Sequence, residues 1–222
     1  MFKTYIFDLD GTLVDTEELH YQAYKKALSE AGLTLPRSDF IQYWLNEGKG
    51  IAKYFKINNI NEEAQKYRLL KEKYFLENLP GKIKLMPGIL SFLKSSLKNK
   101  KKCYVASGSR LSEIKEILKK AEISEYFEDY FGLDSVEKSK PAPDMFLLAL
   151  KKADSENDES LIFENSLNGL LAANEAKVKC VVIPSEMTRN MNFGQFVKIV
   201  DNFENITENF LNKIYFEPYE YQ

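Results

Sequence analysis

The residues best suited to chemistry lie near the start of the chain, in the run DLDGTLVD at residues 8–15. Asp8 and Asp10 are carboxylates one residue apart, and Gly11 allows the loop that carries them to turn tightly. The chain has one histidine, no CxxC and no GxSxG, which excludes a His-rich zinc site and argues against a Ser/His triad. Any hydrolytic chemistry must therefore use carboxylates. The alternative interpretation of a lone DxD is a solvated acidic turn.

Three later polar runs are candidates for the same site, although each is commonplace on its own. The Ser-Gly-Ser run at 107–109 alone would indicate a turn or a helix N-cap. Lys140 alone would be an ordinary surface lysine, and Glu164 and Asn165 simply follow a third apolar run. Their order along the chain, and their positions after predicted strands, favour a shared function.

The elements that must position these residues are short apolar strands separated by helical patterns. Strands are predicted at residues 4–7, 102–106, 161–163 and 180–183, and helices at 89–97, 111–120, 144–152 and 168–177. Continuous apolar strands suit a parallel sheet that is buried on both faces. We therefore predict an α/β fold with a doubly wound, Rossmann-like parallel sheet, which binds ligands at the carboxyl ends of its strands.

Residues 15–80 interrupt this alternation with amphipathic helical runs. Asp15 is the predicted N-cap of the first helix. The aromatic and lysine-rich run at 67–76 predicts a helix whose lysines are solvated, and we assign it no chemistry. We expect a core domain made of residues 1–14 and 81–222, with residues 15–80 forming an inserted helical domain.

The composition excludes several classes of protein. Of 222 residues, 44% are hydrophobic and 29% charged, as in globular proteins. The net charge of −2 provides no basic field for nucleic acid, and no apolar run approaches the ~20 residues of a membrane-spanning helix. We expect a cytoplasmic monomer without a nucleic-acid or membrane partner. Cys103 and Cys180 lie in apolar runs and are expected to be buried, reduced thiols.

Taken together, these motifs resemble those of the haloacid dehalogenase superfamily of phosphohydrolases. DLDGTLVD is similar to its first motif, the run at 107–109 to its phosphate-binding motif, and SKPAPD at 139–144 to its lysine motif. Glu164 and Asn165 stand where the family usually has the acidic pair of E-D-S-x-x-G. The helical insertion resembles the small cap of the subgroup that contains β-phosphoglucomutase and phosphoglycolate phosphatase. The resemblance covers nearly the whole chain and implies a Mg²⁺-dependent phosphatase of a small phosphorylated metabolite, such as a sugar phosphate.

The resemblance also implies a role for each matching residue. Asp8 would attack phosphorus to form an aspartyl phosphate. Asp10 would protonate the leaving oxygen and later take a proton from water. Ser107, Gly108 and Lys140 would bind the phosphoryl oxygens and stabilise their charge.

The Mg²⁺ ion implied by the resemblance would be held by Asp8, Asp10, Glu164 and Asn165. Asn165 departs from the family pattern, because a neutral amide replaces the usual aspartate. We therefore expect weaker metal affinity, and expect Asn165→Asp to lower the Mg²⁺ requirement. The competing hypothesis is a protein that binds phosphorylated metabolites without turning them over.

Two residues of the insertion are candidates for contact with the substrate. His20 ends the run DTEELH, which resembles the cap entry of sugar-phosphate members, and Lys49 in GKG resembles a basic cap residue. A histidine that merely fills the surface or the core, and a solvated lysine, are the alternatives. A phosphomutase remains the nearest rival to a phosphatase, whereas dehalogenation is disfavoured because it has no use for Asp10 as a leaving-group acid.

Overall fold

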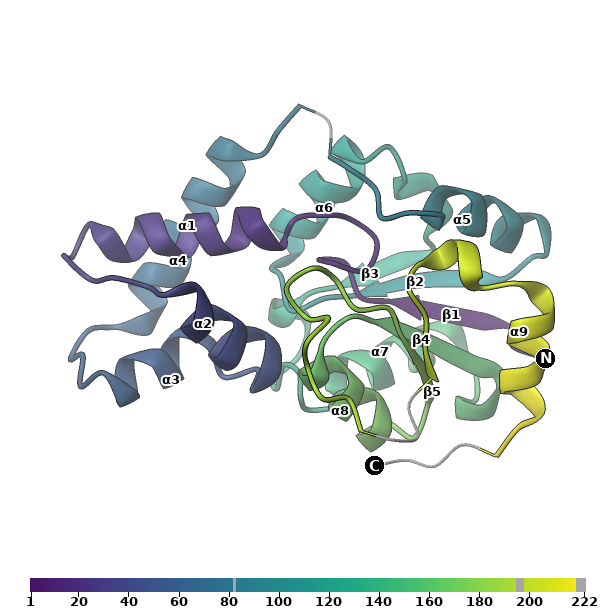
Figure 1. Cartoon of the computed structure of the whole chain (residues 1–222). Coiled ribbons are helices and arrows are strands. Elements are labelled where there is room, and N and C mark those ends of the chain that lie inside the picture. Colours follow the sequence, from purple (N-terminus) through teal and green to yellow (C-terminus); the bar gives the residue numbers. More distant parts are fainter. Residues whose placement is uncertain (82, 195–197, 219–222) are drawn as a thin grey trace.

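A six-stranded parallel sheet forms the centre of the computed structural model, which describes residues 1–81, 83–194 and 198–218. In spatial order the strands are β3 (Asp129–Phe131), β2 (Lys102–Ala106), β1 (Thr4–Phe7), β4 (Ser160–Glu164), β5 (Lys179–Val182) and β6 (Lys198–Ile199) (Figure 1). The chain builds the sheet outward from β1 in one direction and then returns to build the other half. This confirms the predicted doubly wound, Rossmann-like α/β fold.

Five helices cover the two faces of the sheet in the described part of the core. They are α5 (Ile89–Lys98), α6 (Leu111–Lys120), α7 (Asp144–Ala153), α8 (Leu167–Glu175) and α9 (Glu208–Phe216), with 3₁₀ turns at Ser124–Tyr126, Leu133–Ser135, Asn157–Glu159 and Phe203–Asn205. Side chains alternate across β1, so that Tyr5 and Phe7 pack with α5, α6 and α9, whereas Ile6 packs with α7 and α8. The strands are therefore buried on both sides, as their continuous apolar sequence predicts.

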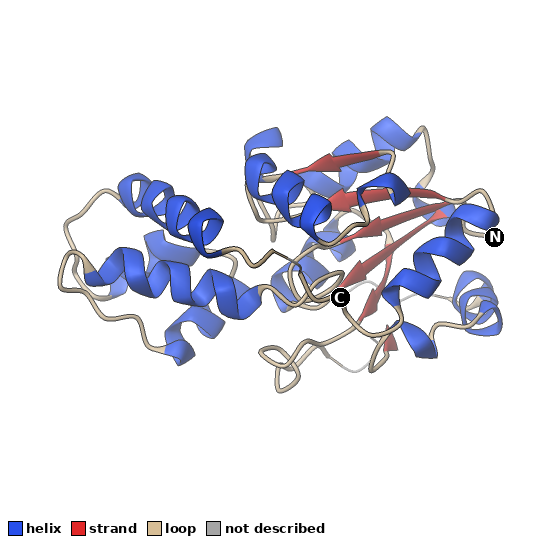
Figure 2. Ribbon diagram, turned by 90° about the horizontal axis from the view of Figure 1, so that it is seen from above, coloured by secondary structure: helices blue, strands red, loops and turns tan. Residues whose placement is uncertain are grey.

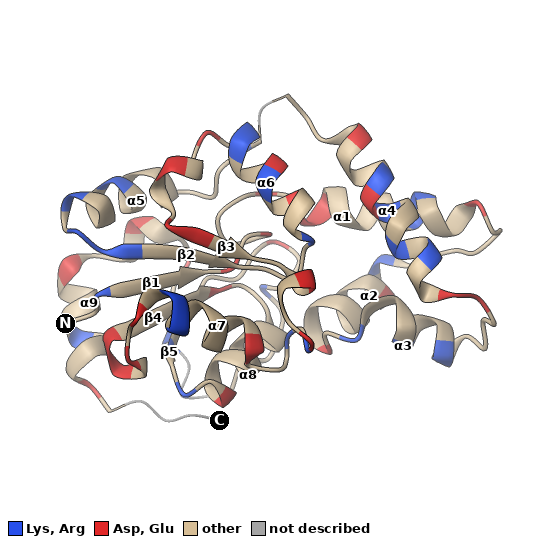
Figure 3. Ribbon diagram, turned by 180° about the vertical axis from the view of Figure 1, so that it is seen from behind, with Lys and Arg blue, Asp and Glu red and all other residues tan. Residues whose placement is uncertain are grey.

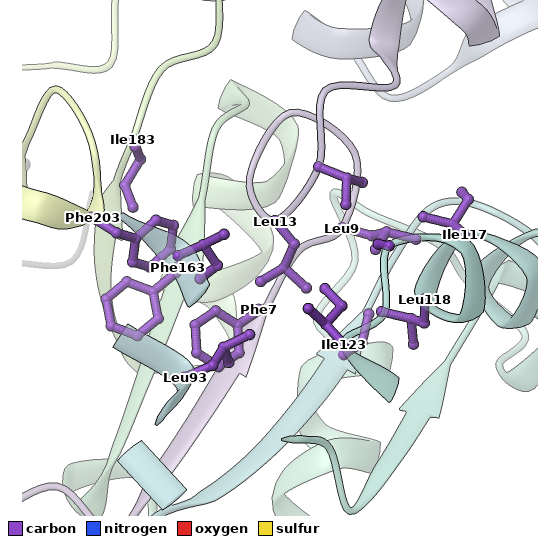
Figure 4. Close-up of a cluster of buried hydrophobic side chains, with 14 of the residues drawn as sticks. Phe7, Leu9, Leu13, Leu93, Ile117, Leu118, Ile123, Phe163, Ile183 and Phe203 are labelled. Atoms are coloured by element: carbon purple, nitrogen blue, oxygen red, sulfur yellow. The ribbon is translucent and has the colours of Figure 1, made fainter. Parts of the chain in front are cut away.

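The loop after β1 is fixed by its own apolar residues. Leu9 and Leu13 are fully buried and pack beside Phe7 and residues of α6 (Figure 4). The carbonyl of Leu9 accepts hydrogen bonds from the N–H groups of Thr12, Leu13 and Val14, so the loop curls tightly around it. With Leu9 directed into the core, the flanking Asp8 and Asp10 are left at the carboxyl edge of the sheet.

The inserted helices form a separate layer beside the carboxyl ends of the strands (Figures 1 and 2). We call them the cap helices: α1 (Glu17–Ser29), α2 (Arg37–Phe40), the π-helical turn Ile41–Asn46, α3 (Gly50–Ile57) and α4 (Ala64–Asn78). They share a hydrophobic cluster that includes Tyr21, Phe40, Phe55 and Tyr67, and Met187 joins it from outside the insertion. The division of the chain at residues 14/15 and 80/81 stays a prediction.

The segments that lead into and out of the cap helices are paired with each other. The N–H of Asp15 donates to the carbonyl of Lys84 at 3.0 Å, and the N–H of Met86 donates to that of Leu13 at 3.0 Å. The prediction of Asp15 as an N-cap is wrong, because Thr16 occupies that position and its hydroxyl is used elsewhere. The Asp15 carboxylate instead pairs with Lys84 at 3.1 Å.

The distribution of surface charge and the state of the two cysteines match the expectations from the composition. Acidic and basic side chains are interspersed along α4 and α6 (Figure 3). Cys103 and Cys180 are buried and form no disulfide, as predicted. None of the described helices is both long and apolar enough to cross a membrane.

Candidate active site

The register of the sheet brings the ends of three strands together. Phe7 of β1 lies between Val105 of β2 and Phe163 of β4. The N–H of Asp8 donates to the carbonyl of Phe163 at 2.9 Å, which extends the ladder by one residue. The side chains that follow these strands therefore meet at one edge, although they lie far apart in the sequence.

A cavity of about 330 Å³ opens at this edge, between the sheet and the cap helices. It is lined by most of the residues predicted to form the site, namely Asp8, Asp10, His20, Lys49, Ser107, Gly108, Lys140 and Asn165. Glu164 does not line it. The structure therefore brings the predicted residues to one cavity, with that one exception, whereas their individual roles stay predictions.

Lys140 lies at the centre of the buried charges. Its Nζ donates to Asp8 Oδ1 at 2.7 Å, to Glu164 Oε1 at 2.5 Å and to the carbonyl of Ala106 at 2.8 Å. Burial opposes its charge, but the two carboxylates outweigh burial and raise the pKa of Lys140 above its usual value. Burial raises the pKa of Asp8, and the Lys140 ammonium opposes that rise. Lys140 thus places an ammonium group in contact with the predicted nucleophile.

Glu164 is placed as a partner of Lys140. Its second oxygen, Oε2, accepts hydrogen bonds from the N–H groups of Asn165 and Ser166 and from the Ser166 hydroxyl, at 2.9 to 3.1 Å. Gly169 makes room for it, since a Cβ there would lie 1.9 Å from its carboxyl carbon. Both oxygens are occupied and the side chain is fully buried. This geometry does not favour Glu164 as a direct metal ligand, and a contact with the metal through a bound water stays a prediction.

Asp10 accepts hydrogen bonds from the core and from the cap helices. From α1 and its N-cap, the Thr16 hydroxyl lies 2.5 Å and His20 Nε2 lies 2.8 Å from Oδ1. From the core, the hydroxyls of Ser109 and Ser107 lie 2.7 and 3.3 Å from Oδ2. Burial opposes ionisation of Asp10, but these contacts, led by His20, hold its pKa below the usual value.

The two predicted cap residues lie in different environments. His20 is buried and stacks on Phe75, with ring centroids 4.1 Å apart, so it contacts Asp10 from a fixed position. Lys49 has 63% of its side chain exposed, and its nearest acidic group, on Glu47, is 3.8 Å away. The contact of either residue with a substrate stays a prediction.

Glu17 is a site residue that the sequence analysis did not identify. It begins α1, is buried and accepts a hydrogen bond from Asn165 Nδ2 at 2.7 Å. Burial raises the pKa of Glu17 to about 7, although hydrogen bonds from Ser185 and Asn165 act in the opposite direction. Its position within DTEELH was visible in the sequence, but nothing there shows that it contacts Asn165.

The residue types that line the cavity fit a magnesium ion. Within the described ranges, no group of three or more His, Cys, Asp and Glu side chains could hold a metal. The cavity is lined instead by Asp8, Asp10 and Asn165, whose carboxylate, backbone carbonyl and amide groups carry oxygen atoms. Mg²⁺ prefers hard oxygen ligands and usually combines one or two carboxylates with water and substrate phosphate. The residues fit Mg²⁺, with less negative charge than a second carboxylate would give.

A buried ion pair joins the cap helices to the core. Lys71 of α4 lies 2.6 Å from Glu113 of α6, and both side chains are buried. Glu72 pairs with Arg110 at 3.1 Å and accepts a hydrogen bond from the Ser112 hydroxyl at the start of α6. The expectation that the lysines of this helix are solvated is therefore wrong for Lys71. Sequence could not reveal its partner, which lies 42 positions away.

We expect Lys71→Met to destabilise the protein by about 3 kcal/mol, because it leaves Glu113 buried without its cation. Urea unfolding of the single variants and of Lys71→Met/Glu113→Gln measures this coupling. The double variant should recover most of the loss. Additive losses in the double variant would contradict the prediction.

Comparisons with known proteins identify a family and several relatives of this chain. A family model described as haloacid dehalogenase-like hydrolase matches residues 5–183. The protein YhcW of Bacillus subtilis (strain 168) is 32% identical, over 88% of this chain and 90% of its own. A phosphorylated carbohydrates phosphatase of Thermotoga maritima is 26% identical, over 78% of this chain and 81% of its own.

Solved structures share the whole architecture. A CbbY variant from Rhodobacter sphaeroides, in complex with xylulose-(1,5)bisphosphate, superposes with a TM-score of 0.82 at 25% identity, covering 92% of this chain and 96% of its own. A β-phosphoglucomutase from Clostridium difficile gives a TM-score of 0.82 at 22% identity, over 97% of both chains. At that identity, the second comparison shows a shared fold.

Proposed function

This chain belongs to the haloacid dehalogenase-like hydrolase family and is a phosphatase, and we propose that it hydrolyses a small phosphorylated sugar through an aspartyl phosphate on Asp8. One observation carries the proposal. Asp8 and Asp10 line one cavity with Ser107 and Lys140, so a nucleophile, an acid/base and donors for the phosphoryl oxygens converge there.

The chemistry follows from these positions. An Asp8 oxygen attacks phosphorus, and the bond from phosphorus to the sugar oxygen breaks as the new bond forms. The Ser107 hydroxyl, the Gly108 N–H and the Lys140 ammonium stabilise the phosphoryl oxygens. Water then attacks the phosphorus, and Asp8 is released as phosphate leaves.

Asp10 transfers the protons in this scheme. It gives a proton to the leaving sugar oxygen and takes one from the attacking water. The contacts from Thr16 and His20 hold it ionised, which suits the second of these steps. Both residues come from the start of α1, so a displacement of the cap helices would remove these contacts and favour the protonated form that the first step needs.

Asp8, the backbone carbonyl of Asp10 and the Asn165 amide oxygen would hold Mg²⁺. When bound, this ion offsets the repulsion between the carboxylates and the phosphate dianion. Lys140 supplies a further positive charge from the protein itself. Asn165 therefore accounts for a lower metal affinity in this proposal without removing the site.

The size and the charge of the cavity favour a phosphorylated sugar as substrate. The cavity volume of about 330 Å³ is at the small end of the range for ligand pockets. The inserted segment contributes three cations to its lining, Lys49, Arg68 and Lys71. Lys71 is paired with Glu113, whereas no acidic side chain in the described ranges pairs with Arg68. The relatives named for phosphorylated carbohydrates and for xylulose bisphosphate point to the same class of substrate.

A panel of sugar phosphates and one aryl phosphate, assayed for free phosphate with and without Mg²⁺, tests the proposal. We expect Mg²⁺-dependent release of phosphate, fastest from a sugar phosphate. Isomerised sugar phosphate without free phosphate would indicate a phosphomutase instead. Binding without any turnover would contradict the proposal and support a phosphometabolite-binding protein.

A further inference from the structure

Glu17 is a buried carboxylate that the proposed reaction does not use. It is 6% exposed, and its hydrogen-bond donors are the neutral side chains of Asn165 and Ser185. No Lys, Arg or His side chain in the described ranges forms an ion pair with it. Buried charges in proteins are normally paired or placed at metal sites. Glu17 lies beside the proposed metal-binding residues of the cavity, so a role at the metal site would explain its burial without a cationic partner.

The hydrogen bond to Glu17 determines which way the Asn165 amide faces. Asn165 Nδ2 donates to Glu17 Oε1 at 2.7 Å, so the NH₂ group of the amide faces Glu17. The amide oxygen, Oδ1, is then turned away from Glu17. Of the two terminal atoms of Asn165, only this oxygen can ligate Mg²⁺.

Gly11 packs the catalytic loop directly against this pair. A Cβ at Gly11 would lie 2.2 Å from Asn165 Nδ2 and 2.7 Å from the Glu17 carboxyl carbon, and the Gly11 φ of +84° also favours glycine. The loop that carries Asp8 and Asp10 therefore leaves the two side chains no room to exchange positions.

We propose that Glu17 is a positioning residue of the metal site, which holds the Asn165 amide with its oxygen toward the part of the cavity that Asp8 lines. The proposal rests on the proposed function, because it concerns the Mg²⁺ site. An aspartate at position 165 would present two equivalent oxygens and would need no such orientation. An asparagine has one ligating atom, and Glu17 supplies the constraint that the amide requires.

Binding of Mg²⁺ to the full chain without substrate, measured by isothermal titration calorimetry at pH 8, tests this role apart from activity. Glu17→Gln offers both a donor and an acceptor, so it no longer fixes the amide, and we expect affinity to fall about tenfold. Glu18→Gln is the matched control, the same change at the next residue, where the side chain is exposed and pairs with Arg37. Its affinity should stay within about twofold of the wild type.

The same substitution in an Asn165→Asp background shows whether Glu17 acts through the amide. Glu17→Gln should not weaken binding there, because an aspartate needs no orientation and the introduced glutamine can donate to it. Equal losses in both backgrounds would show an effect of charge alone and would overturn the proposal. Glu17→Asp shortens the side chain by one methylene and moves the carboxylate away from Asn165, so it should also weaken Mg²⁺ binding. This variant replaces Glu17→Gln in the experiment if Glu17→Gln does not fold.

The failures of the two proposals are distinguishable. A wild type that binds Mg²⁺ and a Glu17→Gln variant that binds it equally well would overturn the positioning role and leave the phosphatase mechanism intact. A wild type that binds no Mg²⁺ would overturn the metal-dependent mechanism and the positioning role together.

Discussion

Replacing Asp8 by asparagine is expected to reduce kcat by about 10⁴-fold or more, because the amide cannot form the phosphoryl bond. The residue lines the cavity, follows β1 and contacts Lys140 at 2.7 Å, so its carboxylate is the nucleophile that the geometry favours. Steady-state release of phosphate from the best substrate of the panel measures the loss.

Folding should survive this change. Burial opposes the charge of Asp8, and the amide is nearly isosteric with the carboxylate it replaces. Asp15→Asn is the matched control in the same loop, since the Asp15 carboxylate is half exposed and pairs with Lys84 outside the cavity. Thermal unfolding should give similar midpoints for both variants. Substantial turnover by a well-folded Asp8→Asn variant would exclude the aspartyl phosphate.

Replacing Lys140 by methionine is expected to abolish turnover and also to destabilise the protein by about 3–5 kcal/mol. The change leaves two buried carboxylates, those of Asp8 and Glu164, without the ammonium that contacts both. Their repulsion would favour protonation of one of them and thereby compromise the nucleophile. Urea unfolding and the phosphate assay measure the two effects separately.

A second substitution separates stability from catalysis at this position. Lys140→Met/Glu164→Gln removes one of the two carboxylates and should recover much of the stability but none of the activity. Lys138→Met, an exposed lysine two residues earlier, is the control and should leave both unchanged. Recovery of activity in the double variant would show that Lys140 has only a structural role.

The sequence predicted the central strands well because burial on both faces leaves a continuous apolar run. The observed β1 and β2 coincide with the predicted residues, and β4 and β5 differ by one residue at their ends. The edge strands β3 and β6 were missed, since they are three and two residues long and begin with Asp129 and Lys198. Such short strands depend on pairing with a neighbour, which no local pattern records.

In the candidate site, too, some features could be predicted from the sequence and others depend on contacts between distant segments. Its core residues follow predicted strands, and a parallel sheet brings such positions together, so Asp8, Ser107 and Asn165 could be identified in advance. The partners of these residues could not. Glu17 and Asn165 are 148 positions apart, and their contact depends on how the cap helices sit on the core. The placement of Glu164 against Lys140 likewise depends on the space that Gly169 leaves.

The chain leaves the sheet and returns to it at one point, where Leu13 pairs with Met86 and Asp15 with Lys84. Because the two ends of the insert are adjacent, the sheet itself does not constrain the length or the shape of the inserted segment. The inserted segment can therefore be exchanged as a unit in evolution or in engineering, provided that two links to the core are retained: the first turn of α1, which contacts Asp10 and Asn165, and a cation that pairs with the buried Glu113. One catalytic core could in this way acquire a series of substrate specificities without any rearrangement of its strands.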